Sequence, residues 1–169
     1  SVVNAANRKG IAAVVAQHSW AALRGAEALA IRFKPTPHDT LDSAAISRQM
    51  RAGLGDGAQP INARADGDWA AVAGSAARVV EADYEVPYLS HSPMEPWNCT
   101  VEFQADGTLH LWAPVQAQDR NRNAAAAAAG LAADKVRLHT TLLGGGFGRR
   151  LGADGVAAAV VTARAVGRP

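Results

Sequence analysis

Leu143-Gly144-Gly145-Gly146-Phe147-Gly148-Arg149-Arg150 is the stretch on which the interpretation of this sequence depends. Glycine has no side chain to bury and loses much backbone freedom on folding, so the four glycines do not serve a hydrophobic core. The stretch follows an apolar run rich in β-branched residues, 136–143, and precedes an alanine-rich run, 156–166. We interpret it as a turn from a strand into a helix with outward-facing backbone N–H groups. Such a turn favours an anion, and two arginines close it.

The composition is that of a globular chain that can form one domain or two small subdomains. The chain has 169 residues, of which 49% are hydrophobic and 5% aromatic. Its 17 basic and 15 acidic residues give a net charge of +2, which does not favour nucleic-acid binding. No segment reaches the roughly 18 apolar residues of a transmembrane helix. Because the sequence does not begin with Met and stops where a new strand is expected, we expect it to be a fragment.

The first part of the sequence, residues 1–60, predicts a strand, helix and strand followed by a linker. Apolar runs and helical spacing favour a buried strand, a helix and a second strand at 11–17, 18–30 and 31–33. A further helix is expected at 41–51, capped by Asp39 or Thr40.

The second part, residues 61–169, predicts a hairpin, a helix, a strand and the glycine loop. The hairpin signal is Asp106-Gly107 between apolar runs at 99–103 and 108–112. The remaining expected elements are a short helix at 68–76, a strand at 78–86, a proline-fixed loop at 87–96, a helix at 117–129 closed by Gly130, and a strand at 136–142. The predicted fold class is therefore α+β, with a mixed sheet and packed helices.

The glycine loop does not have the spacing of the common nucleotide motifs. No Lys-Ser or Lys-Thr pair follows it, and G-x-G-x-x-G is not convincingly matched. A phosphate-binding nucleotide domain is therefore a weak alternative, and a glycine turn needed only for tight packing is another. Phe147 makes the packing-only alternative less favoured: an aromatic ring among glycines has nothing local on which to pack, so it either fills a core or projects toward a ligand.

Residues 142–150 and their flanks resemble the first pterin-binding motif of molybdenum hydroxylase large subunits, the xanthine dehydrogenase and aldehyde oxidoreductase superfamily. Arg149-Arg150 is similar to the isoquinoline 1-oxidoreductase β-subunit branch. Tyr84-Glu85-Val86-Pro87-Tyr88-Leu89-Ser90-His91-Ser92-Pro93-Met94-Glu95-Pro96-Trp97-Asn98-Cys99-Thr100 resembles a second stretch of that branch, and Trp112-Ala113-Pro114-Val115-Gln116 resembles a third. The matches occur in order over most of the chain, which makes the resemblance more specific than the loop alone.

The resemblance implies a fragment of a molybdopterin-binding domain, with molybdenum held as molybdopterin cytosine dinucleotide. It implies hydroxylation of an N-heterocycle, or oxidation of an aldehyde, with water as the oxygen source. The implied partner is a small iron–sulfur subunit or domain, which agrees with the single cysteine, Cys99. The catalytic glutamate of the family would lie beyond Pro169, so the fragment alone is expected to be inactive. A non-catalytic scaffold with the family fold and no cofactor is the alternative.

The resemblance also assigns roles to individual residues. Gln116 would hydrogen-bond an oxygen ligand of the metal, and Phe147 would lie near the substrate funnel; these are the expected catalytic positions. No residue is expected to ligate the metal directly. The expected cofactor-binding residues are Gly144, Gly145, Gly146, Phe147, Gly148, Arg149 and Arg150, with one arginine on an anion and the other structural.

Other residues have a structural and a functional interpretation. Outside the resemblance, Gln116 is simply a solvated residue at a helix start. His91 and Glu95 could form an acid and base pair, but a proline-fixed loop more often uses such side chains to hydrogen-bond its own backbone. Trp97 and Trp112 either line one wall of the site or pack in the core. Cys99 is expected to be a small buried hydrophobic residue, Gly152 and Gly155 to loosen the last helix start, and His18, His38, His110 and His139 to lie on the surface or hairpin.

Overall fold

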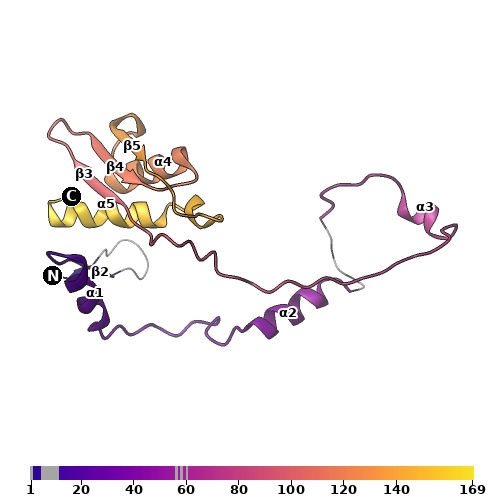
Figure 1. Ribbon diagram of the computed structural model, residues 1–169. Coiled ribbons are helices and arrows are strands. Elements are labelled where there is room, and N and C mark those ends of the chain that lie inside the picture. Colours follow the sequence, from indigo (N-terminus) through magenta and orange to yellow (C-terminus); the bar gives the residue numbers. More distant parts are fainter. Residues whose placement is uncertain (1, 5–11, 56, 58, 60) are drawn as a thin grey trace. The chain divides into compact units, whose positions relative to one another are not determined.

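The structure is a computed structural model that describes residues 2–4, 12–55, 57, 59 and 61–169 (Figure 1). It contains two compact units. The first comprises Ser1–Ile31 together with Ser90–Pro169, and the second is Arg32–Leu89. None of the helices seen in the described residues combines the length and apolar character needed to cross a membrane.

A mixed three-stranded sheet organises residues 100–140. Strands β3 (Thr100–Phe103) and β4 (Leu109–Ala113) are antiparallel, and β4 runs parallel to β5 (Val136–Thr140). The predicted hairpin is confirmed: Asp106 accepts hydrogen bonds from the backbone N–H and the hydroxyl of Thr108. The parallel pairing requires the chain to cross over between β4 and β5, and a helix makes that connection.

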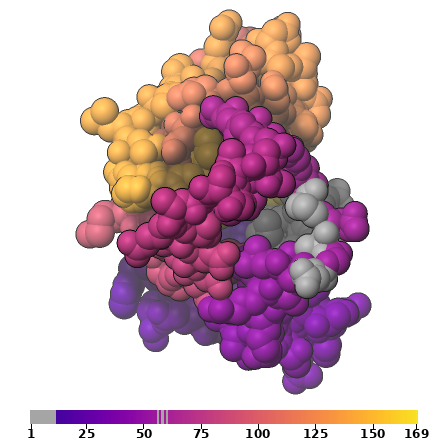
Figure 2. Space-filling model, turned by 90° about the vertical axis from the view of Figure 1, so that its right-hand side faces the viewer, coloured from indigo at the N-terminus to yellow at the C-terminus, as the bar shows by residue number. Residues whose placement is uncertain are grey.

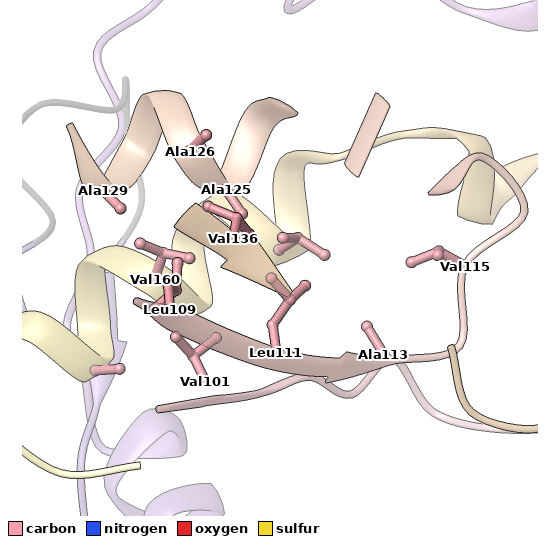
Figure 3. Close-up of a cluster of buried hydrophobic side chains, with 12 residues drawn as sticks. Val101, Leu109, Leu111, Ala113, Val115, Ala125, Ala126, Ala129, Val136 and Val160 are labelled. Atoms are coloured by element: carbon pink, nitrogen blue, oxygen red, sulfur yellow. The ribbon is translucent and has the colours of Figure 1, made fainter. Parts of the chain in front are cut away.

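Helices α4 (Gln118–Ala129) and α5 (Asp154–Val166) pack against one face of the sheet and enclose the core (Figure 3). Gly130 ends α4 in the left-handed conformation, as predicted, with φ 61°. Small side chains on both helices allow a close approach to the strands. The core cluster comprises Val101, Leu109, Leu111, Ala113, Val115, Ala125, Ala126, Ala129, Val136, Val156, Val160 and Ala163. These elements confirm the α+β class with a mixed sheet.

The other face of the sheet carries aromatic rings. Strand alternation places His110 and Trp112 opposite the buried Leu109 and Leu111. His139 stacks on Trp112 with 4.9 Å between ring centroids, and its Nε2 lies 3.3 Å from His110 Nδ1. Trp112 therefore does not share a wall with Trp97, which packs against the core cluster.

The N-terminal elements differ from the prediction. Strand β2 (Ala12–Val14) pairs antiparallel with β1 (Val2–Asn4), but its residues are exposed to half-buried, so the expected buried strand is wrong. Ile11, which was included in that strand, lies outside the described residues. The predicted helix is confirmed as α1 (Ser19–Glu27), and His18 caps it by accepting from the backbone N–H of Ala21.

Within its described residues, the unit Arg32–Leu89 contains two helices, α2 (Ser43–Ala52) and α3 (Trp69–Ala73). Asp42 caps α2, so the expected cap by Asp39 or Thr40 is wrong. Asp39 instead accepts two hydrogen bonds from Thr36. Each cap lies directly before its helix, because a cap must reach the first free N–H groups.

Neither strand expected around this unit forms in the described chain. Residues 31–33 and 78–86 have no strand partner, because an alternating pattern alone does not supply a neighbouring edge to pair with. Glu85 instead accepts hydrogen bonds from Ser47 and Arg51 of α2. Large apolar side chains of this unit, among them Phe33 and Tyr84, are exposed. The atoms of the unit are drawn in purple to magenta in Figure 2.

Candidate functional site

The glycine loop connects β5 to α5 through the short 3-10 turn η2 (Arg149–Leu151), which confirms the predicted strand-to-helix turn. Gly145 and Gly148 have φ values of 99° and 91°, a region that glycine adopts without a steric penalty. Phe147 also has a positive φ, 49°, which costs a residue with a side chain about 1–2 kcal/mol. The residue is 71% exposed. One edge of the ring lies against the loop itself, because its Cε2 atom is 3.1 Å from the position that a Cβ of Gly145 would occupy.

The backbone N–H groups of the loop divide into occupied and free donors. Gly144 N donates to Glu95 Oε2 at 2.8 Å, and Gly148 N donates to Gln116 Oε1 at 3.1 Å. The three N–H groups between them, those of Gly145, Gly146 and Phe147, have no acceptor among the described residues. Three successive free donors in a turn form the kind of concavity that binds an anion or an oxygen ligand.

Gln116 lies directly against the loop although 32 residues separate it from Gly148. Its backbone N–H donates to the carbonyl of Arg150 at 3.1 Å, which fixes the position of the residue. Because Oε1 already accepts from Gly148, the amide NH₂ group is left available as a donor. A Cβ atom at Gly146 would overlap Gln116 Oε1, so only glycine allows this approach.

Arg150 is buried, with 1% of its surface exposed, and its guanidinium contacts several segments of the chain. Its guanidinium donates to the carbonyl oxygens of Gly145 at 2.9 Å, Glu95 at 2.7 Å and Pro114 at 3.4 Å. Nη2 also lies 3.1 Å from the carboxylate of Glu95. The planar fork of an arginine can reach several acceptors at once, which a lysine cannot do. Arg150 therefore joins the glycine loop, the loop of residues 91–98 and the segment that carries Gln116.

Glu95 is the acidic partner in this arrangement. The backbone N–H of Gly144 is the main cause that lowers the pKa of Glu95, followed by Asn98, which donates to Oε1 at 2.8 Å, and by the charge of Arg150. Both carboxylate oxygens are thus occupied. Glu95 was expected either to form an acid and base pair or to accept hydrogen bonds from the backbone of its own loop. It accepts a backbone hydrogen bond, but the donor belongs to the glycine loop.

Arg149 lies in a different environment from its neighbour. It is exposed and pairs with Asp154, with Nη2 2.9 Å from Oδ2 and Nη1 3.1 Å from Oδ1. The hydrogen bond from Arg149 is the main cause that lowers the pKa of Asp154. An exposed pair of this kind can exchange partners at small cost. Arg149 is therefore the arginine that could turn toward an anionic ligand.

The indole ring of Trp97 lies close to both arginines. Its ring lies 5.1 Å from the guanidinium carbon of Arg150 and 5.9 Å from that of Arg149, within the range of a cation–π interaction. A Cβ atom at Gly155 would overlap the indole nitrogen, so the first turn of α5 must have a glycine there. Gly155, which was expected to loosen this helix start, instead makes room for a packed aromatic ring.

Cys99 and the other predicted histidines do not take part in the glycine-loop contacts described above. Cys99 packs against the core cluster, and burial raises the pKa of its thiol to about 11, which keeps it protonated and unreactive. His110 and His139 contact each other on the exposed face of the sheet, and His18 caps α1. In the described part of the chain, no group of three or more His, Cys, Asp or Glu side chains could hold a metal ion. The sequence did not predict the Glu95–Arg150 pair, because 55 residues separate the two side chains and no local pattern connects them.

The donor set fits a cofactor that presents oxygen atoms and negative charge. The loop offers three backbone N–H groups, and Gln116 adds an uncharged amide donor beside them. Neither contributes a formal charge or a metal ligand. Such a site can hold a preassembled metal cofactor through the cofactor's own atoms without ligating the metal.

Two curated proteins are similar to this chain. The isoquinoline 1-oxidoreductase subunit beta of Brevundimonas diminuta is 33% identical over 91 residues, which cover 54% of this chain and 12% of that protein. The membrane-bound aldehyde dehydrogenase [pyrroloquinoline-quinone] of Gluconacetobacter polyoxogenes is 31% identical over 166 residues, which cover 94% of this chain and 20% of that protein. The chain thus spans a fifth or less of the length of these relatives.

The family comparison covers the site itself. The molybdopterin cofactor-binding domain matches residues 55–169, which include the 91–98 loop, Gln116 and the whole glycine loop. The match extends over more than half of the chain and contains every element of the sheet and both helices that pack on it. The chain therefore belongs to the molybdopterin cofactor-binding domain family.

Proposed function

We propose that this chain is part of the molybdenum-cofactor-binding subunit of an oxidoreductase and that its glycine loop holds the cofactor. The observation that carries the proposal is the set of three free N–H donors, from Gly145 to Phe147, with the amide of Gln116 beside it. Backbone donors of this kind are preorganised, because they need no side-chain ordering when a ligand arrives.

The chemistry proposed for the whole protein is hydroxylation of an N-heterocycle or oxidation of an aldehyde. It is supported by the two relatives, whose names give an isoquinoline oxidoreductase and an aldehyde dehydrogenase. The bound molybdenum cofactor would supply a two-electron oxidation with water as the oxygen source. The residues of this chain would bind and orient: Gln116 donates to an oxygen of the cofactor, and the exposed ring of Phe147 contacts an apolar substrate.

The two arginines would have separate tasks. Arg150 has its donors occupied by carbonyl oxygens and by Glu95, so it would hold the loop in shape. Arg149 would exchange its exposed pair with Asp154 for a cofactor phosphate. The proposed form is the cytosine dinucleotide, whose second phosphate gives such an arginine a partner. Electrons would leave through a small iron–sulfur partner subunit or domain.

Analysis of the bound cofactor tests the proposal. The full-length protein, produced with its small subunit, should contain about one molybdenum and one pterin per copy of this chain, with cytosine released on acid hydrolysis. A well-folded complex with neither molybdenum nor pterin would favour a scaffold with the family fold. Pyrroloquinoline quinone in place of pterin would instead favour the chemistry named for the second relative.

A further inference from the structure

Two loops that are distant in the sequence meet at the candidate site. The backbone N–H of Glu95 donates to the carbonyl of Gly144 at 3.1 Å, and a Cβ atom at Gly145 would lie 3.5 Å from Pro93 Cα. Each loop contains one residue with a side chain and a positive φ: Ser92 at 40° and Phe147 at 49°, and these are the only two among the described residues. Such strained residues are found preferentially where a structure presents functional groups.

The strain at Ser92 is next to His91, whose side chain lies over the glycine loop. The Cδ2 and Nε2 atoms of His91 lie 3.7 Å from the position that a Cβ of Gly148 would occupy. Gly148 is also the residue whose N–H donates to Gln116. His91 and Gln116 therefore approach the same glycine, one from each of two separate segments. The imidazole is exposed and has no hydrogen-bond partner in the described part of the chain.

The side-chain acceptors already described at the site have hydrogen-bond partners within the protein. The three free N–H groups of the loop are donors, and Gln116 Oε1 already accepts from Gly148. Both oxygens of Glu95 are occupied, by Asn98 on one side and by Gly144 and Arg150 on the other. A neutral imidazole has one acceptor nitrogen and one donor nitrogen. His91 is thus a side chain beside Gly148 whose imidazole can accept a hydrogen bond from a ligand.

We infer that His91 is a further binding residue of this site, with its imidazole accepting a hydrogen bond from an N–H or O–H group of the bound cofactor or substrate. This inference rests on the proposed function, because the ligand is the one proposed there. The two sources of the N–H or O–H group differ in what they affect. A contact to the cofactor changes cofactor retention and the electron paramagnetic resonance spectrum of the reduced metal, whereas a contact to the substrate changes KM or kcat alone.

The test uses three variants of the full-length protein with its small subunit. His91→Phe keeps a ring over Gly148 but removes the acceptor, His91→Gln restores an acceptor, and His38→Gln is a control at an exposed histidine of the other unit. Molybdenum and pterin content, the resonance spectrum, KM and kcat are measured for each. If His91→Phe does not accumulate, His91→Ala replaces it, since a truncated side chain cannot clash.

We expect His91→Phe to lose about tenfold or more in cofactor retention, or in kcat/KM with the cofactor retained, and His91→Gln to recover most of that loss. His38→Gln should equal the wild type. A His91→Phe protein that equals the wild type in every measurement, or equal losses in His91→Phe and His91→Gln, would overturn the inference and leave a packing role. A wild-type protein without molybdenum or pterin would overturn the proposed function first and this inference with it.

Discussion

Arg150 and Glu95 form an ion pair at the base of the glycine loop, with 3.1 Å between Nη2 and Oε2. The same arginine donates to three carbonyl oxygens, and the same carboxylate accepts the N–H of Gly144. A buried charge is tolerated only when it is paired and fully hydrogen-bonded. The position of the free N–H donors therefore depends on this pair.

Arg150→Lys should weaken the loop strongly. A lysine ammonium cannot reach all the acceptors of the guanidinium, so buried carbonyl oxygens lose their donors. We expect the free energy of local opening of residues 144–150 to fall by about 3 kcal/mol, measured by amide hydrogen exchange in the full-length protein. Arg149→Lys is the matched control, because its pair with Asp154 is exposed, and should change the same quantity by less than about 1 kcal/mol. Equal effects of the two variants would contradict the conclusion that the buried contacts of Arg150 hold the glycine loop in shape.

Acidification should loosen the loop through Glu95. The N–H of Gly144, then Asn98 and Arg150, hold the pKa of Glu95 below its usual value of 4.5. A carboxyl group whose pKa is lowered by folding stabilises the folded state above the unfolded pKa, and this contribution is lost as the pH falls through the lowered pKa. The protection of the Gly144 N–H, corrected for intrinsic exchange, should therefore drop below about pH 4.5. In Glu95→Gln the protection should be lower at neutral pH and should lack this step; a step that persists in the variant would assign it to another group.

Gly155→Ala should destabilise the start of α5, although alanine is the better helix former by about 1 kcal/mol. The added Cβ overlaps the indole of Trp97, and overpacking of this kind costs about 1–3 kcal/mol. Thermal unfolding monitored by tryptophan fluorescence measures the loss. Gly74→Ala is the control, because a Cβ there meets nothing within 4 Å. The cost of Gly155→Ala should largely disappear in a Trp97→Leu background; a cost that is unchanged in that background would mean that Trp97 is not the obstacle.

Gln116→Ala should lower turnover while leaving the pterin content nearly intact. The amide of Gln116 is one donor beside three backbone donors, so its loss should affect the reaction more than retention. Under the proposed function, we expect turnover of the full-length protein to fall about 10- to 100-fold. Gln118→Ala, two residues further along at the start of α4, removes an exposed amide and should be silent. Unchanged turnover in Gln116→Ala would remove Gln116 from the site.

Local signals in the sequence predicted the part of the fold that is determined by nearby residues. The Asp106-Gly107 turn, the helix closed by Gly130 and the turn after β5 all follow from the conformational preferences of a few adjacent residues. The strands expected at 31–33 and 78–86 were wrong because their alternation needed a partner edge that the fold does not supply. β5 ends at Thr140, before the apolar run does, for the same reason: its last paired residue faces Ala113.

The candidate site was predicted less completely than the fold. A glycine loop and a resemblance indicated Gln116 and Phe147, and the structure brings Gln116 to the loop. The roles of Glu95 and Trp97 depend on contacts across 49 residues or more, and no spacing rule reaches that far. Likewise, two adjacent arginines look alike in a sequence, whereas one is buried and the other is exposed.

The contacts of Arg150 also affect when, during folding, a newly made chain can take up a cofactor. Its guanidinium binds carbonyl oxygens 36 and 55 residues earlier in the chain, at Pro114 and Glu95. Contacts at such separations form late, because the intervening chain must be ordered first. The binding turn should therefore acquire its shape only after β4, α4 and β5 have assembled, so that insertion of the cofactor is expected to follow completion of the sheet and not to assist it.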